Sequence, residues 1–237
     1  MRALFHGRLN TKPRGVMAFD SALGRNIGGS WGTIATLASV DGTATHPMPR
    51  ALTGPNVAVR DLADAVHALC WLHGRHPGVI DHAAEHSRQS AAQEWLQDAA
   101  IGFTEERAYL ARLTAVAGPL PSTPGQAESE SAVAGQRHAL DMLAQSDRTG
   151  CATGAAIMLV LDWAAVRTML DGAARRFGLE PRVSTLPDEM ETASLVSALA
   201  ETPAIERAMA FGAQQILAQH RGLWDLLEAR ASARNHQ

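Results

Sequence analysis

The sequence has few cysteines, almost no lysine and no long hydrophobic run, and each shortage excludes a class of protein. Its two cysteines, Cys70 and Cys151, lie in apolar segments and predict buried, reduced thiols rather than the disulfide framework of a small secreted domain. Lys12 is the single lysine, and we attribute the excess of arginine to genome composition rather than to a phosphate site. The longest apolar run, Cys151 to Leu161, is much shorter than the ~20 residues that span a bilayer.

Charge and targeting signals narrow the setting further. The net charge is −3 and charged residues make up 19% of the chain, whereas a nucleic-acid-binding domain presents a basic face. Residues 1–19 carry charges throughout and lack the apolar core of a signal peptide. We therefore expect a cytoplasmic protein that binds neither nucleic acid nor membranes.

The first part of the chain differs from the rest. Residues 1–55 are rich in glycine, contain several prolines and show no helical stripe of apolar residues. We predict that they form an irregular arm that packs on the main body or is partly disordered. Helical patterns dominate from residue 56, so we expect one helical domain over residues 56–231 and a frayed tail over residues 232–237.

Capping and stop signals divide the helical domain into about six or seven helices. The segment 155–161 is apolar on every side, which is typical of a central helix covered all round. Short loops favour antiparallel neighbours, so the predicted fold is a single all-α bundle. The expected helices cover residues 56–76, about 79–101, 104–117, 123–148 and 151–177, followed by one that starts within 184–188 and one over 202–231.

Helical spacing turns a small set of ionisable side chains toward the core, from four different helices. A buried carboxylate is costly unless it is paired or hydrogen-bonded. Burial raises the pKa of a carboxyl group and lowers that of an imidazole, which suits acid–base chemistry. Histidines and carboxylates that project into a bundle are also how helical proteins hold iron, manganese or zinc. The candidate ligand or catalytic residues are His73, His76, Glu106, Asp162 and His220.

Each candidate also has a purely structural explanation. His73 and His76 lie in the last turn of their helix and Glu106 in the first turn of another, where such charges complement the helix dipole. Asp162 can pair with an arginine or bond to a neighbouring hydroxyl group, and His220 can be an ordinary core histidine. The Glu-x-x-His spacing of di-iron bundles occurs nowhere in the chain.

Two further motifs have weaker functional readings. The histidines between His67 and His86 divide between helix faces, and we predict that the face carrying His82, Glu85 and His86 is solvated. The segment 150–154 opens a helix, and a helix N-terminus binds anions and lowers the pKa of a thiol. Its small residues are better explained by the close approach of two helices.

Two stretches, GPLPSTPGQAE at 118–128 and QRHALDMLAQSDRTGC at 136–151, resemble an uncharacterised family of alphaproteobacterial, sphingomonad-type helical proteins. The resemblance extends over residues 61–177. It implies an all-helical fold in a bacterial cytoplasm, and it implies nothing about chemistry.

Two functions stay open. The first is a metal- or small-ligand-binding bundle, ferritin-like in character, in which the candidate histidines are ligands and a carboxylate is a ligand or general base. The second is a non-catalytic interaction or regulatory protein, for example a homodimer, that associates through the arm, where Phe19 and Trp31 look exposed. No motif decides whether the chain is an enzyme.

Overall fold

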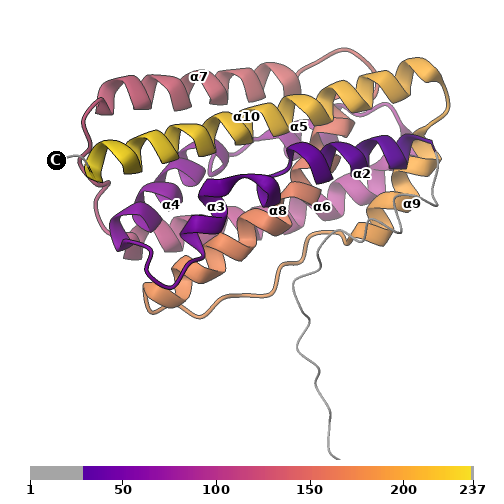
Figure 1. Ribbon diagram of the computed structural model, residues 1–237. Coiled ribbons are helices and arrows are strands. Elements are labelled where there is room, and N and C mark those ends of the chain that lie inside the picture. The colour runs from indigo at the N-terminus through magenta and orange to yellow at the C-terminus, as the bar shows by residue number, and fades with distance from the viewer. Residues whose placement is uncertain (1–28, 236–237) are drawn as a thin grey trace, which may run out of the picture.

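The computed structural model describes residues 29–235, and within this range the chain forms a bundle of helices without any strand (Figure 1). The prediction of an all-α bundle is confirmed for this part of the chain. The α-helices are joined by two short 3₁₀ turns, η1 (Thr43–Thr45) and η2 (Ser90–Ala92). They are α2 (Ser30–Asp41), α3 (Pro47–Leu52), α4 (Val59–His73), α5 (Val79–His86), α6 (Gln93–Ala117), α7 (Gln126–Ala144), α8 (Cys151–Arg176), α9 (Glu189–Leu199) and α10 (Pro203–Asn235).

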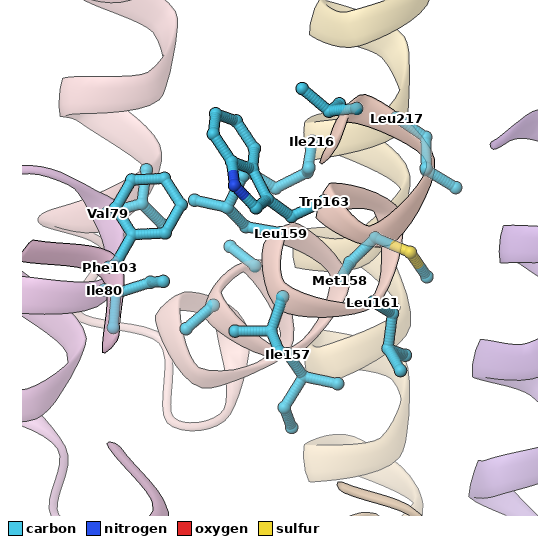
Figure 2. Close-up of a cluster of buried hydrophobic side chains, with 14 of the residues drawn as sticks. Val79, Ile80, Phe103, Ile157, Met158, Leu159, Leu161, Trp163, Ile216 and Leu217 are labelled. Carbon is cyan, nitrogen blue, oxygen red and sulfur yellow. The ribbon is translucent and has the colours of Figure 1, made fainter. Parts of the chain in front are cut away.

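Helix α8 lies at the centre of the bundle, as its sequence predicts. All residues over 155–161 are buried. Their neighbours include Phe103 of α6 on one side and Ile216 of α10 on another (Figure 2). Among the described residues, α8 is the one helix long and apolar enough to cross a membrane, but 83% of its most apolar window is buried inside the bundle, as in the core helix of a soluble protein.

Glycines let α8 and α10 approach each other closely. A Cβ at Gly154 of α8 would lie 2.2 Å from the carbonyl oxygen of Met209, and one at Gly212 of α10 would lie 2.1 Å from that of Cys151. Real Cβ atoms do not come so near, so any larger residue would push the helices apart. The small residues at the start of α8 therefore serve close packing, in agreement with the interpretation from sequence.

The prediction of an irregular arm is wrong for residues 30–52. These residues form α2, η1 and α3, which pack against α8, α9 and α10. Trp31 is only 1% exposed, and it belongs to the core together with Ile34 and Ala38. These three residues follow the three- and four-residue steps of a helix, a short stripe that the surrounding glycines, serines and threonines obscure. Residues 1–28, including Phe19, lie outside the described residues.

The break between the second and third expected helices also lies elsewhere. Helix α5 ends at His86, and α6 begins at Gln93 and runs through Gly102 without interruption. A Cβ at Gly102 would lie 3.1 Å from the Leu186 side chain and from the Thr185 backbone. This glycine therefore makes room for the link that precedes α9, and it does not end a helix.

The prediction of a frayed tail is wrong for residues 232–235, because α10 continues to Asn235. Arg234 is buried and donates hydrogen bonds to Asp64 at 2.7 Å and to Asp61 at 2.8 Å. Arg230, one turn earlier, donates to both carboxylate oxygens of Asp64. Two arginines thus neutralise a buried aspartate and fix the end of α10 against α4.

Candidate functional site

Three of the predicted site residues meet in one hydrogen-bonded row. His73 ends α4, Asp162 lies in α8 and His220 lies in α10, and all three are buried. His220 Nδ1 lies 2.5 Å from Asp162 Oδ2, and His220 Nε2 lies 2.9 Å from Nε2 of His73. We call these residues the Asp–His–His row. Helical spacing predicts that each side chain faces inward, but only the packing of the three helices brings them together.

The carboxylate of Asp162 is satisfied by donors from an unexpected element, the turn η1. Its Oδ1 accepts from the backbone N–H of Thr43 at 2.7 Å, and its Oδ2 accepts from the Thr43 hydroxyl at 2.6 Å as well as from His220. The Thr43 hydroxyl in turn accepts from Trp224 Nε1 at 2.9 Å. A carboxylate that accepts this many hydrogen bonds can be buried without an arginine partner. Of the two structural explanations for Asp162, the bond to a hydroxyl group is therefore confirmed, and the pairing with an arginine is not what the structure shows.

The two imidazoles face each other end to end. Their ring centroids are 5.0 Å apart, and their Nε2 atoms are 2.9 Å apart. The centroid distance exceeds the Nε2–Nε2 distance by approximately the sum of the two ring radii. The two nitrogens therefore point almost directly at one another. This is the geometry of an N–H···N hydrogen bond in which one nitrogen carries the proton. Because Nδ1 of His220 donates to Asp162, the Nε2 of a neutral His220 is an acceptor. Nε2 of His73 then carries the proton that is donated between the two rings.

His73 is held neutral by its surroundings. Burial lowers the pKa of His73 well below its usual value of 6.5, and the neighbouring His220 lowers it further. Its ring packs edge to face against Trp163, with centroids 5.4 Å apart, and against Phe103, at 6.2 Å. Because these aromatic rings offer it no negative charge, an imidazolium at His73 would be poorly solvated. The neutral form of His73, which carries one ring proton, is therefore the favoured one.

Glu106 belongs to a second network that touches the row through an indole ring. Its carboxylate accepts two hydrogen bonds from Arg167 Nη1, at 2.7 and 2.8 Å, one from Trp163 Nε1 at 3.0 Å and one from the Ser184 hydroxyl at 2.7 Å. The same Trp163 packs against His73. Glu106 is thus a paired structural carboxylate that orients the wall of the row, and it makes no hydrogen bond with either histidine.

His76 does not join the row. Its side chain is 69% exposed, and its Nδ1 lies 3.4 Å from Asp81. Arg107 is buried beside it and pairs with the same aspartate at 2.9 Å. His76 follows the end of α4, so the helical spacing that placed it inward no longer applies.

Each end of the row adjoins a hollow. Thr43 lines a groove of about 540 Å³ between α3, α8 and the link before α9, and Figure 1 shows α3 beside α8. At the other end, His73 lines a hollow of about 20 Å³ together with Arg137 and Asp141, which is the size of a single water molecule. Sequence reasoning missed Thr43, since nothing in the pattern around it connects it with a residue far along the chain.

Two other clusters bring three potential metal ligands close together. His82, Glu85 and His86 place one ligand atom each within 4.8 Å of one another on the partly exposed face of α5. His46 forms a similar group with Asp225 and Glu228. However, Nδ1 of His46 accepts from the backbone N–H of Met48 at 3.1 Å, so its Nε2 carries a proton that is donated to Asp225. This leaves no lone pair of His46 for an ion.

Comparison with known proteins assigns the chain to a family without assigning it a chemistry. The chain belongs to a family of unknown function (DUF6975), whose model matches residues 38–235. Comparison with curated proteins and with solved structures gives no match. Membership of an uncharacterised family is thus confirmed, whereas a bacterial, cytoplasmic setting stays a prediction. The matched range includes every member of the Asp–His–His row and Thr43.

Proposed function

We propose that this protein binds a small, largely apolar molecule in the groove beside Thr43, and that the Asp–His–His row behind the groove takes up or releases a proton in step with binding. The observation that carries the proposal is the continuous hydrogen-bonded path from Thr43 through Asp162 and His220 to His73. Each end of this path lines a hollow. A structural core histidine needs only one satisfied partner, and no hollow at all.

The groove has the make-up of a ligand site. Its apolar lining includes Val160, Leu161 and Ala164 of α8, together with Pro49 and Pro187. A few polar groups lie among these apolar ones, which is the usual composition of a small-molecule pocket, and about 540 Å³ is within the usual size. The polar members are Thr43, Arg50, Thr53, Thr168, Asp188 and Glu189.

The row balances a proton as follows. In the neutral state, His220 donates from Nδ1 to Asp162, and its Nε2 accepts the proton carried by Nε2 of His73. When a proton reaches Nδ1 of His73 from the small hollow, the proton on Nε2 of His73 moves to Nε2 of His220. His73 is then neutral again, and His220 is an imidazolium paired with the Asp162 carboxylate. The net result is one proton stored on His220, where a negative charge stabilises it.

The row suits proton transfer better than metal binding. An ion shared by His73 and His220 would have to stand between nitrogens that are 2.9 Å apart and directed at each other, whereas the metal–nitrogen bonds of zinc alone are about 2.0 Å each. Both carboxylate oxygens of Asp162 already accept hydrogen bonds from protein groups. The row as built therefore does not fit iron, manganese or zinc, and we derive no step through a metal.

Fluorescence of anilinonaphthalene sulfonate, an aromatic probe that carries one sulfonate group, tests the groove. We expect saturable binding that Ala164→Trp abolishes, because Ala164 is exposed in the groove and the indole would fill it. Ala111→Trp is the matched control, since Ala111 is an exposed helical alanine of α6 outside the groove. Equal binding to both variants would show that the probe goes elsewhere and would refute the groove as the site.

Imidazole nitrogen resonances of histidine-labelled protein test the link to the row. We expect the probe to shift the resonances of His73 and His220 in the wild type. Thr43→Val keeps the shape of the side chain but removes the hydroxyl bond to Asp162, so in this variant the probe should bind with a much smaller shift. If the probe binds to the wild type without moving either resonance, the groove is not coupled to the row.

The alternative function, association through the N-terminal arm, stays a prediction. Phe19 lies outside the described residues, and Trp31 is buried and so offers no contact surface. Of the two residues that suggested a contact surface in the arm, Trp31 is therefore ruled out.

A further inference from the structure

A second cavity, of about 450 Å³, lies at the start of α8, before the middle part of α8 that lines the groove, and it shares no residue with the groove. It is enclosed by the start of α8, the segment that leads into it from α7 and the segment that follows α5. We call it the α8 cavity. Most of its lining residues have polar side chains, among them Ser87, Arg88, Gln89, Arg148 and Thr153.

The cavity faces free backbone donors. Helix α8 is 26 residues long, and its N-cap is Gly150, which has no side chain to cap it. Cys151 N–H bonds to the Arg148 carbonyl and Gly154 N–H to that of Gly150. Within the described part of the chain, no hydrogen bond uses the N–H groups of Ala152 and Thr153, and both residues line the cavity. Such donors at the positive end of a long helix attract an anion.

Gln89 supplies independent evidence for a ligand. The residue is only 9% exposed and is one of those that line the cavity, and both its Nε2 and its Oε1 are buried without a hydrogen-bond partner among the described residues. Buried amide groups are rarely left unpaired, because each unmade bond is costly. Nε2 needs an acceptor and Oε1 needs a donor. A ligand with an anionic oxygen and a neighbouring hydroxyl group meets both needs.

The charges around the cavity favour an anion. Arg88 and Arg148 are exposed at its edge, and neither forms an ion pair within the described residues. Asp147 is the one acidic residue in the lining, so the two arginines leave an excess of positive charge there. His86 also lines the cavity, and its Nδ1 donates to the carbonyl of His82 at 3.0 Å.

We infer that the α8 cavity binds the phosphate group of a small phosphorylated polyol. The N–H groups of Ala152 and Thr153 and the Nε2 of Gln89 donate to the phosphate oxygens, the Oε1 of Gln89 accepts from a hydroxyl, and the arginines balance the charge. The cavity volume leaves room for a body of several atoms beyond the phosphate. This site is separate from the groove and does not depend on the function proposed for it.

Amide resonances of the intact protein provide the test, with inorganic phosphate as the first probe and chloride used to keep the ionic strength constant. We expect saturable shifts of the Ala152 and Thr153 amides and of the Gln89 side-chain amide. Glycerol 3-phosphate, the second probe, should bind more tightly than inorganic phosphate, because it carries hydroxyl groups for Oε1 of Gln89. Shifts that fail to saturate, or that chloride alone reproduces, would overturn the inference. A glycerol 3-phosphate affinity no higher than that of inorganic phosphate would overturn the polyol assignment.

Two variants and one control separate binding from folding. Gln89→Met keeps the volume but removes the amide, so phosphate should bind about tenfold more weakly, as loss of a hydrogen bond to a charged group predicts. The fold should be retained, since the change removes unpaired buried groups. Replacing Arg88 and Arg148 together by glutamine should weaken binding at least as much, whereas Arg112→Gln, an exposed arginine near the far end of α6, should leave it unchanged. Equal affinities in all three proteins would refute the site.

Discussion

Replacement of His73 by glutamine should remove part of the acid sensitivity of the fold. Burial lowers the pKa of His73 well below 6.5 in the folded protein, whereas the unfolded chain protonates this residue near 6.5. Below pH 6.5 the unfolded state therefore binds more protons at this position than the folded state, and the folded state loses stability as the pH falls. The loss continues until the pH reaches the lowered folded-state pKa, where it levels off.

The magnitude follows from the exchange of one proton. A difference of one proton changes the free energy of unfolding by about 1.4 kcal/mol per pH unit. Between pH 7.5 and 5.5, His73 alone should therefore lower the stability by about 1.4 kcal/mol, because most of the effect falls below pH 6.5. Glutamine places an amide nitrogen close to the position of Nε2, so it keeps a donor toward His220 but has no proton to gain in this range.

Urea unfolding at a series of pH values measures the effect. The wild type should show a steeper fall in stability below pH 6.5 than His73→Gln, with the difference approaching about 1.4 kcal/mol per pH unit. His138→Gln is the control, because His138 is exposed on α7 and should leave the slope unchanged. If His73→Gln and the wild type lose stability in parallel, the depressed pKa of His73 is not the cause and the account of the row as a neutral pair is wrong.

Two other substitutions test the Glu106–Arg167 ion pair beside the row and the close approach of α8 and α10. Glu106→Gln should destabilise the protein by about 3 kcal/mol, because it leaves the buried guanidinium of Arg167 with less compensating charge. The control Glu105→Gln changes an exposed neighbour and should alter the stability by less than about 0.5 kcal/mol. Equal effects of the two substitutions in urea unfolding would contradict the buried pair. Gly154→Ala should cost about 1–3 kcal/mol because its Cβ would meet the backbone of α10. Gly172→Ala, where a Cβ meets nothing within 4 Å, should instead stabilise α8 by roughly 1 kcal/mol, so a loss at Gly172 or none at Gly154 in thermal unfolding would refute the close approach.

Local patterns in the sequence were enough to predict most of the helices after residue 56 and the direction of several side chains. The continuous apolar run at 155–161 identifies the central helix, and the order Thr202-Pro203 marks the start of α10, where the Thr202 hydroxyl accepts from the backbone N–H of Ile205 at 3.3 Å. Spacing also turned Asp162 and His220 inward, as the structure has them. These features depend on neighbours within a few turns of one helix.

The remainder depends on contacts between distant segments, which periodicity does not encode. Thr43 lies 119 residues before Asp162, and no spacing rule connects a threonine in a short turn with a carboxylate in a later helix. Gly102 looks like the end of a helix, but its role is set by Leu186, which packs against it. The prediction that His76 faces inward was wrong for another reason: α4 ends at His73, so the helical face does not extend to His76.

His220 lies in α10, which follows the helices of Asp162 and His73 in the sequence, and this order has a consequence for biosynthesis. The ribosome produces Thr43, His73 and Asp162 before α10, so the Asp162 carboxylate acquires its imidazole partner only after α10 has been synthesised. Until then, the apolar side of α8 that α10 covers faces the surroundings of the nascent chain. Premature termination anywhere before residue 220 would leave this apolar side of α8 exposed and Asp162 without its imidazole partner. We expect chaperones or proteases to recognise such a polypeptide, and we do not expect it to function as a shorter form of the protein.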